Sequence, residues 1–160
     1  MRNKLPPRAT RKQPQSQRGV MLIEALVAIA IFSFAILGIV GLQATAIRTV
    51  RDADYRAKAS LLANQIVGQM WVDRFNVPTY ALNAADVPCS SGTNATGNAA
   101  VTSWLSGLSD PTNPGSLPGA TDLKQQIVVG PSNAITLTLC WQGPQDATPH
   151  NFTLTTQIQG

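Results

Sequence analysis

The chain has 160 residues, a length that suits one globular domain. Its formal charge of +4 is unevenly placed: residues 1–18 hold six Lys or Arg and no acid, and the rest holds six bases against eight acids. The remainder therefore carries a net charge near −2. This balance excludes a broad basic surface for nucleic acid, so we expect no direct nucleic-acid binding.

Residues 1–19 are a polar, basic, proline-containing leader that we expect to be disordered. The next 23 residues, 20–42, contain only two clearly polar side chains, Glu24 and Ser33. As a helix this run would be about 35 Å long, enough to cross a bilayer core of about 30 Å. We therefore predict a transmembrane helix over residues 20–43.

Glu24 is the unusual residue of this run, because an ionised carboxylate in hydrocarbon is normally kept only where a partner neutralises it. It lies five residues after Gly19. If the chain were cut after Gly19, the new amine of Val20 would carry a positive charge about one helical turn from Glu24. Such a cut would create a partner for the acid.

The sequence of residues 18–32, RGVMLIEALVAIAIF, resembles the class III signal of type IV prepilins and pseudopilins. The resemblance implies that a prepilin peptidase cleaves between Gly19 and Val20, that the Val20 amine is methylated, and that Glu24 acts in assembly. It implies partners too: the peptidase, other minor and major pilins through the N-terminal helix, and the inner membrane. Val20 and Met21 depart from the family, where phenylalanine and threonine are common. The alternative is an ordinary signal anchor with an incidental glutamate.

The leader charge predicts a single-pass inner-membrane protein with its N-terminus in the cytoplasm and residues beyond about 44 in the periplasm. After assembly the head would lie in the extracellular fibre. A cleaved secretory signal is the rival interpretation, but the apolar run is too long and no small-residue site closes it. Cys89 and Cys140 both fall in the periplasmic part, where we expect them to form a disulfide and not to remain two unpaired buried thiols.

Residues 44–77 change to a one-faced pattern and predict the amphipathic half of the same helix. No proline occurs between Val20 and Val77, so one helix is expected to run until Pro78 stops it. Met70 and Trp71 are expected in the core. Gly38 and Gly41 allow either close helix packing or local melting. The apolar residues expected to share the buried face are Ile47, Val50, Leu61, Leu62, Ile66, Met70 and Phe75.

Residues 78–160 are expected to form a periplasmic head. A short amphipathic helix is predicted over 99–108, and period-two alternation predicts strands over 124–129, 134–142 and 151–159. Short connections favour an antiparallel meander with one face on the helix. The predicted fold is α+β and pilin-like: a long N-terminal helix packed on a small antiparallel sheet. The residues expected to face the helix are Ile135, Leu137, Leu139, Trp141, Phe152, Leu154 and Ile158.

No catalytic constellation is visible, so we expect no enzyme activity, no cofactor and no small-molecule substrate. His150 is the only histidine and is expected in a polar loop. A calcium site at Asp110 or Asp122 is a minor alternative to turn or capping roles. Asn94 begins an Asn-Ala-Thr glycosylation sequon, a match that is common by chance.

The spacing of three features of the head narrows the family resemblance. Trp104, then Leu117-Pro118-Gly119, then Cys140-Trp141 are spaced as in minor pilins of the type IV pilus modification protein PilV kind. The resemblance therefore favours a minor pilin that acts in pilus assembly or in adhesion or DNA uptake. The alternatives are a minor pseudopilin of a type II secretion system and a single-span inner-membrane protein with a periplasmic binding head.

Overall fold

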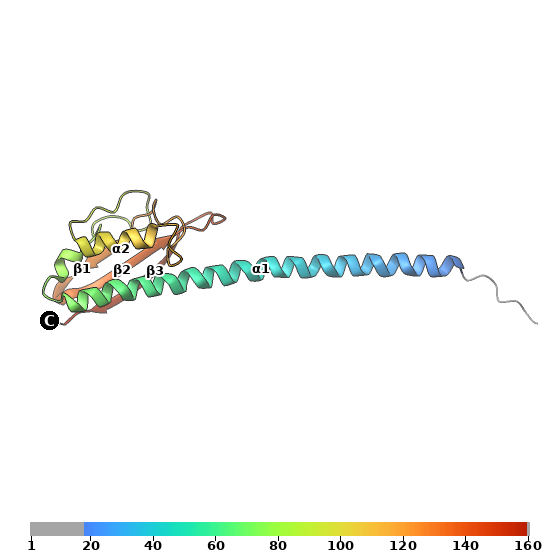
Figure 1. Cartoon of the computed structure of the whole chain (residues 1–160), viewed down its shortest axis with the longest axis horizontal. Helices are drawn as coiled ribbons and strands as arrows, with labels where there is room; N and C mark the ends of the chain where they lie inside the picture. Colours follow the sequence, from blue (N-terminus) through green and yellow to red (C-terminus); the bar gives the residue numbers. More distant parts are fainter. Residues whose placement is uncertain (1–17, 160) are drawn as a thin grey trace, which may run out of the picture. The chain divides into compact units, whose positions relative to one another are not determined.

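A computed structural model describes residues 18–159, so the leader lies outside the described residues except for Arg18 and Gly19. The chain divides into two compact units, Met1–Ile47 and Arg48–Gly160. One helix, α1, begins in the first unit and ends in the second (Figure 1). The elements in chain order are α1 (Arg18–Val72), η1 (Val77–Tyr80), α2 (Ala99–Ser109), β1 (Gln126–Val129), η2 (Pro131–Asn133), β2 (Ala134–Trp141) and β3 (His150–Gln157).

The described part of the first unit is α1 alone. Every residue from Val20 to Ile47 is exposed, and nearly all of these residues are apolar. The helix is long and apolar enough to cross a membrane, as predicted. Burying this surface requires lipid or other apolar helices, because nothing in the described chain covers it.

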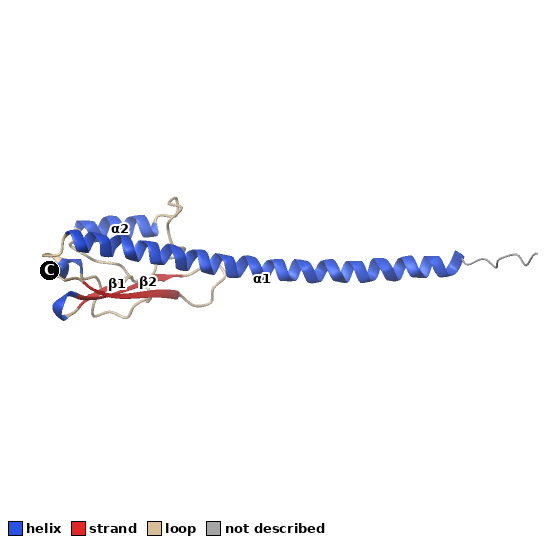
Figure 2. Ribbon diagram, turned by 90° about the horizontal axis from the view of Figure 1, so that it is seen from below, coloured by secondary structure: helices blue, strands red, loops and turns tan. Residues whose placement is uncertain are grey.

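The second unit is a two-layer α+β structure. The C-terminal part of α1 and the short helix α2 lie on the same face of a three-stranded sheet (Figure 2). The sheet has the order β1-β2-β3, and both strand pairs are antiparallel. The three strands, the α2 helix and the meander connection match the sequence prediction, with strand ends shifted by one or two residues.

The core of the second unit lies between these layers. On β2, Ile135, Leu137, Leu139 and Trp141 are fully buried, as predicted. Residues of α1 spaced three or four apart cover them, because side chains at this spacing share one helix face. The buried residues of α1 are Ala59, Leu62, Ala63, Ile66, Val67 and Met70.

Helix α1 ends at Val72, so the prediction that it continues to residue 77 was wrong. Pro78 disfavours helical backbone at the preceding residue and its ring would clash with the Arg74 carbonyl of a continuing helix. The restriction of Pro78 therefore reaches back by about one turn. The chain turns at residues 73–75 and re-enters as η1, which buries Val77 and Tyr80 in the core.

The apolar pattern of α1 in the second unit belongs to two opposite faces and not to one. Leu62 is 8% exposed, whereas its neighbour Leu61 is 69% exposed, because consecutive residues of a helix are about 100° apart. Trp71 is also half-exposed, unlike buried Met70. The predicted single buried stripe is thus wrong for four members, which are exposed: Ile47, Val50, Leu61 and Phe75.

The outer edge of β1 is covered by the segment that follows η1. Leu82 and Ile127 exchange two backbone hydrogen bonds, with N–O distances of 3.0 and 2.9 Å. A disulfide between Cys89 and Cys140 then joins this segment to β2, with a Cα–Cα distance of 5.2 Å. The predicted disulfide is confirmed, and it links the irregular half of the head to the sheet.

Candidate functional site

Gly19, Val20 and Glu24 lie in the first turns of α1. Val20 and Glu24 are four residues apart in a continuous helix, so both side chains occupy one face about one turn apart. Glu24 is exposed and is the only charged residue between Val20 and Ile47. The helix therefore places a Val20 amine, if one is created, within reach of the Glu24 carboxylate.

Two hydroxyl side chains in the first unit bond to the helix backbone. The Ser33 hydroxyl donates to the Ile29 carbonyl at 2.8 Å, and the Thr45 hydroxyl donates to the Gly41 carbonyl at 3.2 Å. Such bonds satisfy a hydroxyl without a second chain. Within residues 18–159 no hydrogen bond or ion pair reaches Glu24, so its carboxylate is the group in this run that needs an external partner.

An exposed apolar row runs along α1 in the second unit, opposite the buried face. Val50, Leu61 and Val72 are spaced by 11 residues, which returns a helix almost to the same direction after three turns. All three are exposed, and so is Phe75 beyond the end of the helix. The row consists of separate exposed side chains about 16 Å apart along the helix and is not a continuous apolar patch. Sequence reasoning missed it because it assigned all apolar positions to one face.

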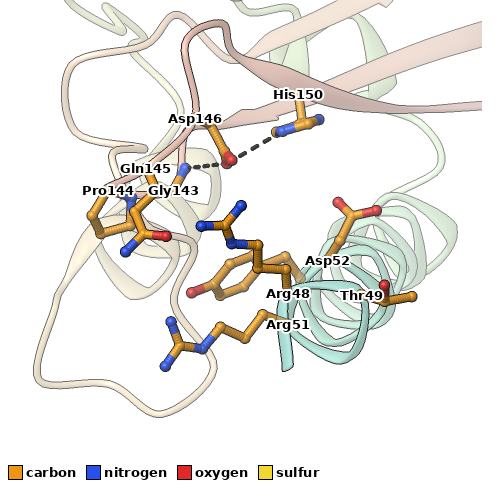
Figure 3. Close-up of a pocket in the computed structure, with 10 residues that line it drawn as sticks. Arg48, Thr49, Arg51, Asp52, Gly143, Pro144, Gln145, Asp146 and His150 are labelled. Carbon is orange, nitrogen blue, oxygen red and sulfur yellow. Dashed lines mark hydrogen bonds and ion pairs between the residues drawn. The ribbon is translucent and has the colours of Figure 1, made fainter. Parts of the chain in front are cut away.

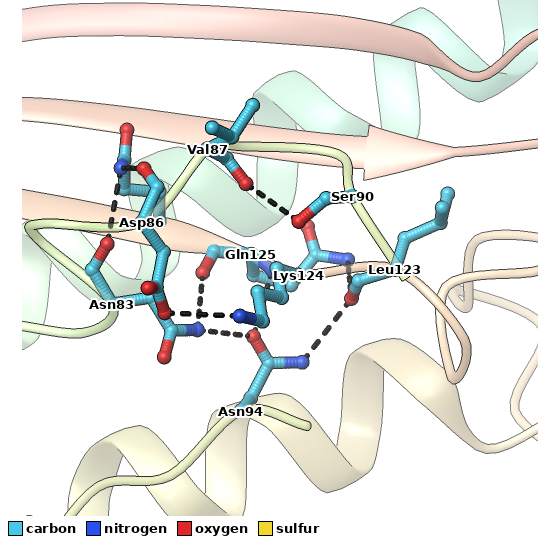
Figure 4. A network of polar contacts seen from close by, with 9 residues as sticks. Asn83, Asp86, Val87, Ser90, Asn94, Leu123, Lys124 and Gln125 are labelled. Atoms are coloured by element: carbon cyan, nitrogen blue, oxygen red, sulfur yellow. Dashed lines mark hydrogen bonds and ion pairs between the residues drawn. The ribbon is translucent and has the colours of Figure 1, made fainter. Parts of the chain in front are cut away.

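Polar contacts hold the loop that carries Cys89 (Figure 4). The Asn83 amide donates to the Asn94 side-chain oxygen and to the Gln125 carbonyl, both at 2.9 Å. The Asn94 amide in turn donates to the Leu123 carbonyl at 3.2 Å. Lys124 pairs with Asp86 at 3.1 Å. Asn94 is thus a part-buried structural residue, which argues against a role as a free glycan acceptor.

A cavity of about 450 Å³ lies where α1 enters the second unit (Figure 3). One wall is α1 and the other is the connection between β2 and β3. The side chains of Arg48 and Arg51 extend from the helix toward this connection. The lining residues are Arg48, Thr49, Arg51, Asp52, Tyr55, Gly143, Pro144, Gln145, Asp146 and His150.

His150 lies at this cavity and not in an isolated polar loop, so that prediction was wrong. It is the first residue of β3, and its ring stacks on Trp141 with centroids 5.9 Å apart. Its Nε2 atom lies 3.2 Å from the Asp146 carboxylate. The Gly143 amide donates to the same carboxylate at 2.9 Å. The contacts of Asp146 fix the shape of the connection.

The acids considered for calcium do not belong to a group of three possible metal ligands within the described residues. Asp110 accepts hydrogen bonds from the Thr112 hydroxyl at 2.7 Å and from the Thr112 amide at 2.8 Å. The hydroxyl bond first, then the amide bond, lowers the pKa of the Asp110 carboxyl. Asp110 thus has the turn role that was the main expectation. Within residues 18–159 no three His, Cys, Asp or Glu side chains are grouped so as to hold a metal.

No protein-family model, curated protein or solved structure matches the chain. The resemblance to prepilins therefore rests on the motif in residues 18–32 and on the looser spacing in the head.

Proposed function

We propose that the chain is a minor pilin that is processed by a prepilin peptidase and takes part in type IV pilus assembly or function. The peptidase cuts after Gly19 and methylates the Val20 amine. The helix then anchors the subunit in the inner membrane, with the head in the periplasm, until other pilins take it into a fibre. In this proposal the protein is a substrate of the peptidase and a structural subunit.

The observation that carries the proposal is that Val20 and Glu24 share one face of α1, in a run of residues 20–47 that has no other charge. A carboxylate at this depth is expensive unless it meets a positive charge. Cleavage after Gly19 supplies one. In a fibre, the Val20 amine of a neighbouring subunit is an equally good partner, and unlike charges attract strongly where water is scarce.

The exposed faces of α1 support an assembly role. The apolar run has no cover of its own, and the row of Val50, Leu61 and Val72 continues apolar exposure into the second unit. A large exposed apolar surface marks an interaction site with protein or membrane. Lipid would cover the apolar run before assembly, and a bundle of pilin helices would cover it in a fibre.

Intact-mass analysis of the membrane-extracted protein tests the processing step. We expect loss of residues 1–19 and a gain of one methyl group in cells with an active prepilin peptidase. Gly19→Ala should block the cut. Beyond its chain neighbours and the nearby helix backbone, no described atom lies within 4 Å of a methyl group added at Gly19, so a block would reflect the peptidase and not a clash with the rest of the described chain. Recovery of the uncut wild-type chain would overturn the proposal.

Replacement of Glu24 tests the assembly step. Glu24→Ala should remain inserted, cleaved and folded, yet be recovered poorly with sheared fibres or with other minor pilins at equal membrane abundance. Ser33→Ala is the matched control, because the Ser33 hydroxyl bonds only within its own helix. Equal recovery of Glu24→Ala and wild type would show that helix packing alone sets the docking register.

One observation favours a second candidate function. The cavity beside Arg48 and His150 would suit a single-span membrane protein whose periplasmic head binds a ligand. The processing experiment separates the two candidates, because the second needs no cut after Gly19.

A further inference from the structure

One face of α1 changes its chemistry within the second unit. Tyr55 and Arg51 precede Ala59 by four and eight residues, and Arg48 precedes it by eleven, so all four lie on nearly the same helix face. Ala59 is fully buried against the core, whereas Arg48 and Arg51 are exposed. The helix face that packs against the core therefore carries two arginines at its N-terminal end, where they line the cavity.

The acids of the cavity are already paired. Asp52 binds Arg56 at 3.1 Å, and Asp146 binds both His150 and the Gly143 amide. Among residues 18–159 neither Arg48 nor Arg51 has an ion pair or hydrogen bond. The cavity therefore offers two uncommitted guanidinium groups to a ligand (Figure 3).

Two guanidinium groups that line one cavity can bind a phosphate. Arginine presents a planar fork of N–H donors that fits phosphate oxygens, often with two parallel bonds. The cavity volume of about 450 Å³ is within the range of ligand sites, roughly 300–1,000 Å³. It leaves room for a polar group attached to the phosphate.

The position of the arginines in the chain favours a lipid source for that phosphate. Arg48 follows the last residue of the apolar run, Leu42, by six residues, or about 9 Å of helix. Arginine carries its charge at the end of a long aliphatic stem, so the guanidinium can lie well away from its own Cα. Headgroups occupy about 5–8 Å on each side of the bilayer core. The arginine thus comes within reach of the headgroup layer.

We propose that Arg48 and Arg51, with Tyr55 and the 143–146 connection, bind the phosphate of an anionic phospholipid headgroup. This lipid site rests on the membrane span and not on pilus assembly. Its failure would leave the processing proposal intact, and cleavage after Gly19 is measured separately.

Native mass spectrometry of the full chain in neutral detergent tests the site. The protein is mixed with phosphatidylglycerol and phosphatidylethanolamine in equal amounts, and the retained lipid is measured. We expect selective retention of phosphatidylglycerol, and Arg48→Gln/Arg51→Gln should weaken it about tenfold or more, since charge-assisted hydrogen bonds are lost. Arg74→Gln is the control for loss of a positive charge outside the cavity, because Arg74 lies over the Phe75 ring.

Further measurements keep the result interpretable. Gln145→Glu places a negative charge on the exposed wall and should also reduce retention, without altering either arginine. Retention by the double variant equal to that of the Arg74→Gln control would overturn the proposal. So would binding of inorganic phosphate without any retention of phosphatidylglycerol. The double variant could also retain lipid unchanged but lose co-purifying pilins. That result would assign the arginines to an acidic protein partner and would also overturn the lipid proposal.

Discussion

The two parts of α1 obey different constraints although both are regular helix. Before residue 48 every described side chain of α1 from Val20 onward is exposed, and the run is apolar on all sides. From Ala59 to Met70 one face is buried to near completion and the opposite face is not. Backbone hydrogen bonding is the same in both parts, so the difference lies in what surrounds the side chains.

This difference separates two kinds of sequence requirement. In the apolar run most positions need only be hydrophobic, because lipid or neighbouring helices adapt to them. In the second unit each buried residue fits a specific space, because protein interiors are close-packed. All three tryptophans lie in the second unit, so tryptophan fluorescence reports its unfolding and not the state of the apolar run.

The largest effect should come from the disulfide, which constrains only the second unit. Cys89→Ser/Cys140→Ser should lower its free energy of unfolding by at most about 4 kcal/mol on the chain-entropy account, since a long loop is released. Denaturant unfolding of the detergent-solubilised chain measures the loss. Reductant should destabilise the wild type and leave the double variant unchanged. Equal stability of the two proteins would contradict the prediction.

A matched pair of isoleucines tests the contrast directly. Ile66→Ala should cost about 3 kcal/mol of unfolding free energy, because Ile66 is fully buried and a cavity remains. Ile31→Ala, in the exposed apolar run, should leave the fluorescence-detected transition unchanged. A similar loss in both variants would mean that the apolar run contributes to the stability of the head.

A smaller effect is expected where α2 meets α1. The Trp104 indole N–H donates to the Leu62 carbonyl at 2.9 Å, and Trp104→Phe should cost about 1 kcal/mol by removing this donor. Trp71→Phe is the control, because Trp71 is 47% exposed. Each variant lacks one of the three tryptophans, so its fluorescence cannot be compared with that of the wild type. Denaturant unfolding is therefore followed by circular dichroism. A null result at Trp104 would mean that packing alone joins the two helices.

The smallest effect concerns pH. Because hydrogen bonds from Thr112 lower the pKa of Asp110, the ionised form is favoured in the folded state. The resulting stabilisation is present above the ordinary carboxyl pKa and is lost as pH falls through the lowered one. Thr112→Val removes the hydroxyl donor, so the Asp110 pKa should rise toward its usual value. Carbon-detected NMR titration of the carboxyl measures it, and an unchanged pKa would contradict this cause.

Local patterns predicted much of the fold. Period-two alternation located the three strands, because one face of the meander packs on the helices. The periplasmic assignment predicted the Cys89–Cys140 bond in a chain with only two cysteines. In contrast, the end of α1 depends on how far the restriction of Pro78 reaches back. The exposure of Leu61 and Trp71 depends on which face the sheet covers, which a list of apolar residues does not specify.

The candidate sites differ in the same way. Gly19, Val20 and Glu24 are close in sequence, so helical geometry alone relates them. The cavity joins Arg48 and Arg51 to a connection about 95 residues later, and only the folded meander brings them together. The sequence did contain a signal for the end of the core. The helix face that carries Ala59 and Tyr55 continues to Arg48 and Arg51, and a core that extended that far would have apolar residues there.

The disulfide also gives the chain a mechanical property. Cys89 and Cys140 are 51 residues apart, and the ring that they close contains α2, β1 and most of β2. Tension applied between the N-terminal helix and the C-terminus cannot extend this ring. At about 3.4 Å per extended residue, the oxidised chain is roughly 170 Å shorter under full extension than the reduced chain. The oxidised chain therefore reaches a shorter maximum length when it is pulled from both ends.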